Sequence, residues 1–218
     1  INIGKFGEIL KLIKSKKCNK VIFAGNIIKP RISELKLDLR GLSYIPRIVK
    51  ASKKGDAAIL KVLIKILSEN KIKVIKLNTF NPELTLKKGI YTKIKPALLE
   101  KEEIATGIKI LKKINSYDHT QAVIIRDNKI ISRETRKGTK EMIKSIPKSK
   151  IKKGILIKLP KAKQDLRVDL PTIGIDTFKD CNKVGIKGIV VKSNQNIILN
   201  KEVCIKYANQ NKLFLISI

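Results

Sequence analysis

The chain has 218 residues, of which 43% are hydrophobic, and a formal net charge of +31. This length and apolar fraction predict one or two globular domains and exclude a disordered chain. The three cysteines show no CxxC or Cys/His spacing, which argues against a disulfide framework or a zinc site. No apolar run approaches the ~20 residues that a membrane span needs, so we expect a protein of the reducing cytoplasm.

The positive charge does not by itself indicate a nucleic-acid partner. Only seven of the 49 basic residues are Arg, aromatic residues make up 4%, and Lys is dispersed along the whole chain. Nucleic-acid binders rely on Arg for bidentate contacts and on aromatic rings for stacking. We therefore expect no nucleic-acid partner, and only a weak attraction to an anionic membrane surface, of up to ~1 kcal/mol per suitably placed Lys.

The first part of the chain alternates helices and strands. We predict a helix over 6–15, a strand over 20–24 that turns at Gly25, a short helix capped by Ser33, a helix over 57–67 capped by Asp56, and a strand over 73–77. This alternation is typical of an α/β domain with a partly parallel sheet, here residues 1–80. No strand precedes the first helix, so we expect that an N-terminal βα portion is missing.

From residue 78 to residue 96 the apolar periodicity is lost, and we assign residues 81–97 to a linker. Beyond it we predict a helix over 100–114, a hairpin of strands 121–125 and 129–132, a helix over 138–146 and a strand over 155–157. A helix over 172–181, strands over 188–192 and 195–199, a helix over 201–211 and a strand over 213–218 complete a second α/β domain, residues 98–218. The predicted fold is therefore two α/β domains joined by a linker, with mixed, largely parallel sheets.

Polar side chains crowd the segment that follows the apolar strand 155–157. Within six residues it holds an amide, two carboxylates and a guanidinium, from Gln164, Asp165, Asp169 and Arg167. Open α/β sheets place their chemistry at the carboxyl ends of strands, and carboxylates suit Mg²⁺ binding or the activation of water. Lys158 and Lys161 would add the positive charge that a phosphorylated substrate needs. The alternative is a solvated surface loop with local Asp–Arg pairing.

Several segments together resemble the UDP-2,3-diacylglucosamine pyrophosphatases of the lipid A pathway, the family unrelated to the calcineurin-like hydrolases that perform the same step. The likeness covers nearly the whole chain and is most specific at residues 164–174. That family begins with a Gly-rich strand-turn-helix which this chain lacks, in agreement with the missing start. The matching segments are Val21-Ile-Phe-Ala-Gly25, Lys29-Pro-Arg31, Asp38-Leu-Arg-Gly-Leu42, Gly55-Asp56, Gln121-Ala-Val123, Gly138-Thr139 and Gln164-Asp-Leu-Arg-Val-Asp-Leu-Pro-Thr-Ile-Gly174.

The resemblance implies Mg²⁺-dependent hydrolysis of the pyrophosphate of a lipid-linked UDP-sugar. The products would be UMP and 2,3-diacylglucosamine 1-phosphate (lipid X), formed at the cytoplasmic face of the inner membrane. It also implies two α/β domains with the lipid substrate held between them. A different interpretation is a lipid or nucleotide-sugar binding module without turnover. The oligomeric state stays open, with a homodimer among the options.

The resemblance also assigns roles to individual residues. Asp165 and Asp169 would be the catalytic and metal-binding carboxylates, with Glu134 as a third metal ligand. Lys137 and Lys140 stand where the family has carboxylates, so Glu134 is the only carboxylate candidate in that segment. Plainer alternatives exist for two of the substrate-binding assignments: Gly25 would only relieve a tight turn, and Gly138-Thr139 would only cap a helix. The substrate would be bound by Gly25, Gln121, Gly138, Thr139, Lys158, Lys161, Gln164 and Arg167.

Overall fold

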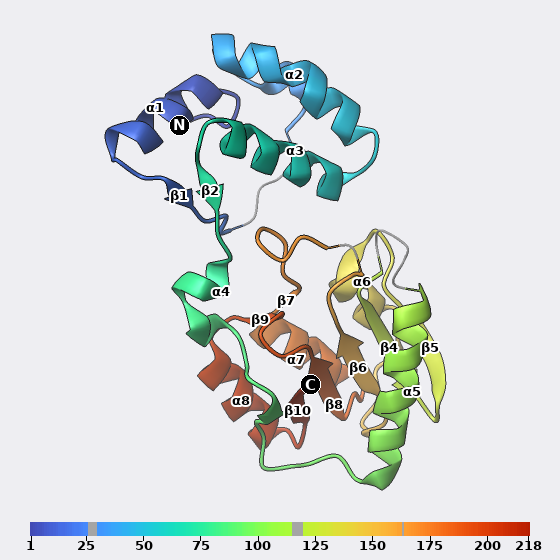
Figure 1. The fold of residues 1–218 in the computed structure, drawn as a ribbon. Helices are drawn as coiled ribbons and strands as arrows, with labels where there is room; N and C mark the ends of the chain where they lie inside the picture. The colour runs from blue at the N-terminus through green and yellow to red at the C-terminus, as the bar shows by residue number, and fades with distance from the viewer. Residues whose placement is uncertain (26–29, 115–119, 163) are drawn as a thin grey trace. The chain divides into compact units, whose positions relative to one another are not determined.

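The computed structural model describes residues 1–25, 30–114, 120–162 and 164–218. The chain divides into two compact units, Ile1–Phe80 and Asn81–Ile218. In Figure 1 the first runs from blue to teal and the second from green to red. Each unit combines helices with strands, so the α/β class predicted from the sequence is confirmed. Within the described ranges, no helix has both the length and the apolar character needed to cross a bilayer.

Among its described residues, the first unit is mainly helical and contains one short sheet. Its two strands pair in parallel, with Lys20 opposite Lys73 and Val21 opposite Val74. The predicted strands at 20–24 and 73–77 are therefore shorter than expected, and a helix already begins at Leu77. In chain order the elements are α1 (Phe6–Ser15), β1 (Lys20–Val21), the 3₁₀ helix η1 (Ile32–Glu34), α2 (Leu39–Ser52), α3 (Asp56–Glu69), β2 (Lys73–Val74) and α4 (Leu77–Phe80).

Helix α2 is absent from the elements predicted above. It begins after Asp38, whose carboxylate accepts hydrogen bonds from the backbone N–H of Gly41 at 2.7 Å and of Glu8 at 3.0 Å. The first bond caps α2, and the second ties its start to α1. Pro46 lies inside the helix, where proline removes a backbone donor, so α2 forms against its intrinsic propensity.

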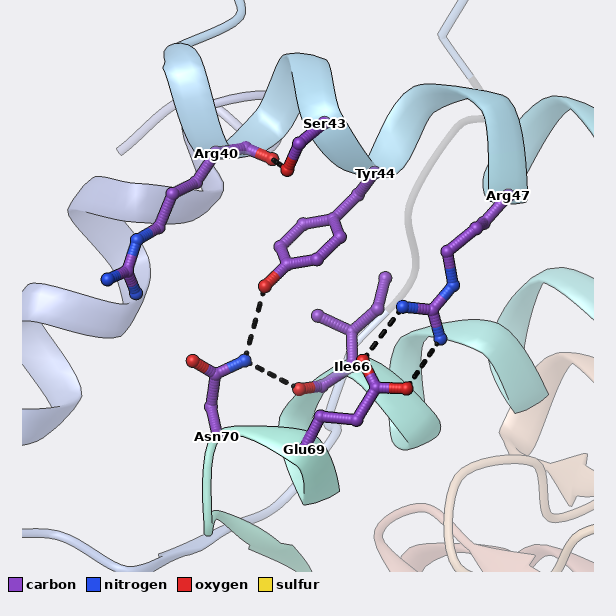
Figure 2. Close-up of polar contacts among 7 residues, drawn as sticks. All are labelled: Arg40, Ser43, Tyr44, Arg47, Ile66, Glu69 and Asn70. Atoms are coloured by element: carbon purple, nitrogen blue, oxygen red, sulfur yellow. Dashed lines mark hydrogen bonds and ion pairs between the residues drawn. The ribbon is translucent and has the colours of Figure 1, made fainter.

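Polar contacts join α2 to α3, as Figure 2 shows. The Arg47 guanidinium donates two hydrogen bonds to the Glu69 carboxylate, at 2.8 and 2.9 Å. The Asn70 amide donates to the Tyr44 hydroxyl at 3.3 Å and to the Ile66 carbonyl at 2.8 Å. Because both members of the ion pair are partly exposed, we expect it to orient the two helices more than to stabilise them.

The second unit is built around a six-stranded sheet with the order β3-β10-β8-β6-β4-β5. The three central strands β10, β8 and β6 are parallel, and the outer pairs are antiparallel. In chain order the elements are η2 (Pro82–Leu84), β3 (Gly89–Ile90), α5 (Leu98–Ile114), β4 (Ala122–Arg126), β5 (Lys129–Arg133), α6 (Gly138–Lys144), β6 (Ile155–Lys158), β7 (Thr172–Ile173), α7 (Ile175–Lys183), β8 (Gly188–Val191), β9 (Ile197–Ile198), α8 (Lys201–Gln210) and β10 (Phe214–Ser217).

Two segments of this unit differ from their sequence assignments. Residues 81–97, assigned to a linker, contain β3, which pairs with β10 at the edge of the sheet. The predicted helix over 172–181 begins with a strand instead, because Thr172 and Ile173 pair in parallel with Ile197 and Ile198. In both cases the partner strand lies far along the chain, so local patterns do not reveal the pairing.

The core lies on both faces of the large sheet. On one face Leu156 of β6 packs with Phe178 of α7 and Cys204 of α8. On the other face Ile157 packs with Leu111 of α5. A strand that is buried on both faces has a continuous run of apolar residues, and this run over 155–157 predicts a buried strand from the sequence.

Candidate functional site

Most of the predicted site residues of the second unit lie at one edge of the six-stranded sheet. Strand β6 ends at Lys158, which pairs with Ala122 at the start of β4 and with Val191 at the end of β8. Gln121 directly precedes β4, and the backbone N–H of Glu134 donates to the Ala122 carbonyl at 2.9 Å. Ligand sites in open α/β sheets lie at this carboxyl edge of the parallel strands.

Lys158, Thr139 and Glu134 form a hydrogen-bonded chain. The Lys158 Nζ donates to the Thr139 Oγ1 at 2.6 Å, and that hydroxyl donates to the Glu134 Oε1 at 2.5 Å. The other carboxylate oxygen of Glu134 accepts from the backbone N–H of Gln121 at 2.9 Å. Lys158 is 6% exposed and Glu134 is 3% exposed, so both charged groups are buried and need such partners. The chain fixes the position of the Lys158 amine.

Burial lowers the pKa of the Lys158 amine, and the positive charge of Lys161 acts in the same direction. The carboxylates of Glu134 and Asp169 oppose this shift by stabilising the ammonium form. Asp169 therefore lies close enough to Lys158 to influence its charge. The site holds an amine that gives up its proton more readily than a lysine on the surface.

The loop after β6 is organised around Asp165. Its carboxylate accepts hydrogen bonds from the Arg167 Nε at 2.9 Å, the Arg167 Nη2 at 2.7 Å and the Arg167 backbone N–H at 3.1 Å. Its carbonyl accepts from the backbone N–H groups of Val168 and Asp169. The local Asp–Arg pairing considered from the sequence is therefore present. Among the described residues, no group donates a hydrogen bond to the Asp169 carboxylate.

Gln121 and Gln164 each hold a buried polar atom without a hydrogen-bond partner in the described part of the chain. These atoms are the side-chain oxygen of Gln121 and the side-chain nitrogen of Gln164. The Gln164 oxygen is used locally, since it accepts from the Lys161 backbone N–H at 2.8 Å. An unpaired buried polar atom costs about 1–3 kcal/mol, so both atoms favour a polar ligand or water at this edge.

Asn196 belongs to the same edge but was not identified from the sequence. It is 1% exposed, and its side chain donates to the Lys158 carbonyl at 3.1 Å and accepts from the Lys192 backbone N–H at 2.8 Å. It thereby joins the ends of β6 and β8. The sequence signal is slight: one amide residue directly ahead of the apolar strand Ile197–Ile198.

Two glycines that were predicted to bind the substrate have a positive φ and free space beside the Cα atom. Gly138, before Thr139, has a φ of +84°, and no atom of the described residues lies within 4 Å of the position that a Cβ would take, its own chain neighbours aside. This leaves room for a ligand to approach its backbone. Gly25 has a φ of +99° and equally open surroundings, but it belongs to the first unit. Its part in substrate binding stays a prediction.

The fit to Mg²⁺ depends on which carboxylates are free to bind it. The described residues contain no group of three or more Asp, Glu, His or Cys side chains arranged for a metal. Both oxygens of Glu134 are hydrogen-bonded within the chain, and Asp165 is paired with Arg167. Asp169 remains. Because Mg²⁺ usually binds through one or two carboxylates together with substrate phosphates, Asp169 fits such a shared site.

Comparisons with known proteins cover nearly the whole chain. Residues 1–84 match the family model described as the LpxI N-terminal domain, and residues 87–216 match the LpxI C-terminal domain. A curated relative, the UDP-2,3-diacylglucosamine pyrophosphatase LpxI of Caulobacter vibrioides, is 29% identical over 226 residues. That alignment covers 100% of this chain and 81% of the relative.

Proposed function

The chain belongs to the LpxI family, and we propose on this premise that it hydrolyses the pyrophosphate bond of UDP-2,3-diacylglucosamine. The products are UMP and 2,3-diacylglucosamine 1-phosphate, an intermediate of lipid A biosynthesis. The observation that carries the proposal is the edge of β6, where the buried cation Lys158 lies near the Asp169 carboxylate. Hydrolysis of a pyrophosphate needs both a cation for the phosphoryl oxygens and an acceptor for a proton of the attacking water.

We assign a separate role in the reaction to each of the described side chains at this edge. A water oxygen bonds to one phosphorus as the bridging P–O bond breaks, and negative charge moves among the phosphoryl oxygens. We assign Lys158 and Lys161 to offset that charge, and Asp169 to orient the water and accept its proton. Asp165 holds the Arg167 guanidinium through two of its five N–H donors, which leaves the others for a phosphoryl oxygen.

Glu134 receives a different role from the metal ligand suggested by the resemblance. Its two oxygens accept hydrogen bonds from Thr139 and from the backbone of Gln121, so we propose that it positions the Lys158 amine. For Mg²⁺ we propose Asp169 and the phosphates of the substrate as ligands. When bound, the ion would neutralise part of the pyrophosphate charge.

The first unit supports a lipid substrate. It contains a cavity of about 150 Å³ lined almost entirely by apolar side chains, among them Phe6, Ile45, Ile48 and Leu63. We propose that this cavity shelters part of an acyl chain, and that the protein works at the cytoplasmic face of the inner membrane. Its net charge of +31 would favour anionic lipids, by about 1 kcal/mol for each suitably placed Lys.

The test is direct. The purified protein is incubated with UDP-2,3-diacylglucosamine in detergent micelles with Mg²⁺, and UMP is quantified over time. We expect UMP release that stops when EDTA is added and resumes with excess Mg²⁺. Saturable substrate binding without UMP release would support the alternative of a binding module. UMP release that EDTA does not change would support the assignment as a hydrolase and contradict the proposed role of Mg²⁺.

A further inference from the structure

Among the described residues, the three most exposed large apolar side chains of the second unit lie at one edge of its sheet. Leu98 and Leu99, in the first turn of α5, are 72% and 73% exposed, and Ile151, in the segment before β6, is 67% exposed. This amino edge, where the parallel strands β6, β8 and β10 begin, lies opposite the edge at which Lys158 ends β6. Exposed apolar side chains that gather in one region indicate an interaction surface.

Two contacts place the start of α5 at the amino edge. The amine of Lys187, the residue before β8, donates a hydrogen bond to the Glu100 carboxylate. The backbone N–H of Asn128, in the turn after β4, donates to the Glu103 carboxylate at 3.3 Å. Because β4 is antiparallel to β6, that turn also lies where the parallel strands begin. The first turn of α5 is therefore held at the same edge as the segment that leads into β6.

The amino edge also carries a cationic pocket of about 570 Å³. Its described lining contains no carboxylate, although Lys183 contacts Asp180 at 3.5 Å beside it. Burial lowers the pKa of the Lys152 amine, which donates to the side-chain oxygen of Asn182. An anionic phosphate in the pocket would stabilise the charged form of that amine. The residues that line the pocket are Lys148, Ser149, Lys150, Lys152, Asn182 and Lys183.

The segment 148–153 is held in place by its backbone. The Ser149 N–H donates to the Lys183 carbonyl at 3.1 Å, and the Lys153 N–H donates to the Gly185 carbonyl at 2.7 Å. Gly185 has a φ of +74°, and a Cβ there would lie 2.3 Å from the Ile151 carbonyl oxygen, so this approach requires glycine. Because the segment is already ordered, its lysines lose less conformational entropy on binding a ligand.

We infer that the amino edge of the second unit docks on the surface of an anionic phospholipid bilayer. The pocket lysines contact the headgroup phosphates, and Leu98, Leu99 and Ile151 enter the boundary between headgroups and acyl chains. A soluble phosphate would fill the pocket but leave these apolar side chains in water. A second copy of the chain is a poorer partner, because it would bring two sets of pocket lysines towards each other.

The inference rests on the proposed function for the choice of membrane, because a diacylated substrate is a membrane lipid. Docking through the amino edge leaves the opposite edge, with Lys158, free for the substrate. Strand β6 has four residues, which separate the two edges by about 13 Å at the rise of a strand. The substrate headgroup therefore leaves the bilayer surface to reach Lys158, as a protein that shelters an acyl chain allows.

Co-sedimentation with vesicles tests the inference without turnover. The vesicles consist of phosphatidylcholine alone or of equal parts phosphatidylcholine and phosphatidylglycerol, which is anionic, and they contain no UDP-sugar. One double variant removes two apolar side chains of the edge and another removes two pocket cations: Leu98→Ser/Leu99→Ser and Lys148→Ala/Lys150→Ala. The matched controls replace exposed residues outside this edge: Leu199→Ser/Val203→Ser and Lys87→Ala/Lys88→Ala.

We expect the wild type to bind the anionic vesicles at least about tenfold more tightly than vesicles of phosphatidylcholine alone. Each of the two amino-edge variants should bind the anionic vesicles about tenfold more weakly than the wild type, because each loses one of the two contributions to interfacial binding. Both control variants should bind like the wild type.

Several results would overturn the inference: no binding of the wild type to anionic vesicles, equal binding to both kinds of vesicle, or edge variants that bind like the wild type or like the controls. Weaker binding in Lys148→Ala/Lys150→Ala alone would do so too, since it indicates a phosphate site without apolar contact. So would a dimer that Leu98→Ser/Leu99→Ser dissociates in sedimentation velocity, since the occupant would then be a second copy.

The melting temperature of each variant, followed by circular dichroism, shows whether the fold is kept. If the leucine double variant fails to fold, Ile151→Ser takes its place with the same expected direction. The outcome is independent of the activity assay. Vesicle binding without UMP release from the substrate would refute the hydrolase and keep the docking edge, whereas UMP release from micellar substrate without vesicle binding would do the reverse.

Discussion

Lys158 ends a strand whose side chains are all buried, and its environment sets its charge. Burial lowers the pKa of its amine, while Glu134 and Asp169 favour the protonated form. A phosphoryl-binding cation must keep its proton to work. Activity should therefore fall as pH rises through the lowered pKa of Lys158, at a pH below the ordinary value of about 10.4 for lysine.

The pH profile of kcat/KM tests this role. In Lys158→Arg the cation stays charged throughout the accessible range, because the guanidinium pKa exceeds about 12. We expect the alkaline fall in kcat/KM to move to higher pH or to vanish in Lys158→Arg, even if the maximum is lower. Lys206→Arg, outside the site, should keep the wild-type profile. An alkaline limb that is identical in wild type and Lys158→Arg would exclude Lys158 as its origin.

Residue patterns alone predicted site residues only where a strand and the loop after it adjoin in sequence, and Gln121, Glu134 and Thr139 were predicted from the family resemblance. Lys158 and Gln164 follow directly from a buried strand that leads into a polar loop. Asn196 was not predictable, since its hydrogen bond to the Lys158 carbonyl spans 38 residues. The unpaired amide atoms are likewise features of packing, which no residue pattern expresses.

At the scale of single elements, α2 shows how a tertiary contact supports a helix that its own residues disfavour. Gly41 and Pro46 both lower its propensity, and they explain why it was missed. The Asp38 carboxylate compensates by accepting hydrogen bonds at the start of α2 and from the first turn of α1. These bonds lower the pKa of Asp38, the bond from Gly41 most.

The stability of the protein should depend on pH through Asp38. A carboxyl whose pKa is lowered on folding stabilises the native state above its unfolded pKa, about 3.9, and loses that contribution as pH falls through the folded value. We expect Asp38→Asn to unfold at lower denaturant than the wild type at pH 7, with the difference shrinking towards pH 3. Asp127→Asn, in the exposed hairpin turn, is the control. A constant difference at both pH values would mean that the charge of Asp38 contributes nothing.

The sheet of the second unit depends on a close approach between β8 and β10. Gly188 pairs with Phe214, and a Cβ at Gly188 would lie 1.9 Å from the Phe214 ring. Overpacking of this kind costs about 1–3 kcal/mol. We expect Gly188→Ala to lower the free energy of unfolding by at least that amount, and Phe214→Leu to relieve part of the loss in the double variant. Additive effects of the two substitutions in denaturant titrations would contradict the proposed clash.

For the whole molecule, the α/β class could be predicted because apolar strands alternate with amphipathic helices along the chain. The sheet order could not, since β3, β10 and β8 are brought together by pairings between distant segments. Short strands such as β3, β7 and β9 carry too few residues for any periodicity. The net charge of +31 does not indicate where the site lies, because the lysines of the protein are spread over the whole chain and few of the described ones lie at the edge of β6.

Turnover of Asp169→Asn tests the catalytic assignment most directly. The substitution keeps the shape of the side chain and removes the charge that orients water and accepts its proton. UMP release from UDP-2,3-diacylglucosamine with Mg²⁺ is measured for wild type, Asp169→Asn and the control Asp127→Asn. We predict a loss of about 10²–10⁴-fold in kcat for Asp169→Asn alone, with an unchanged melting temperature. Wild-type turnover in a stably folded Asp169→Asn protein would contradict the placement of the reaction at this edge of the sheet.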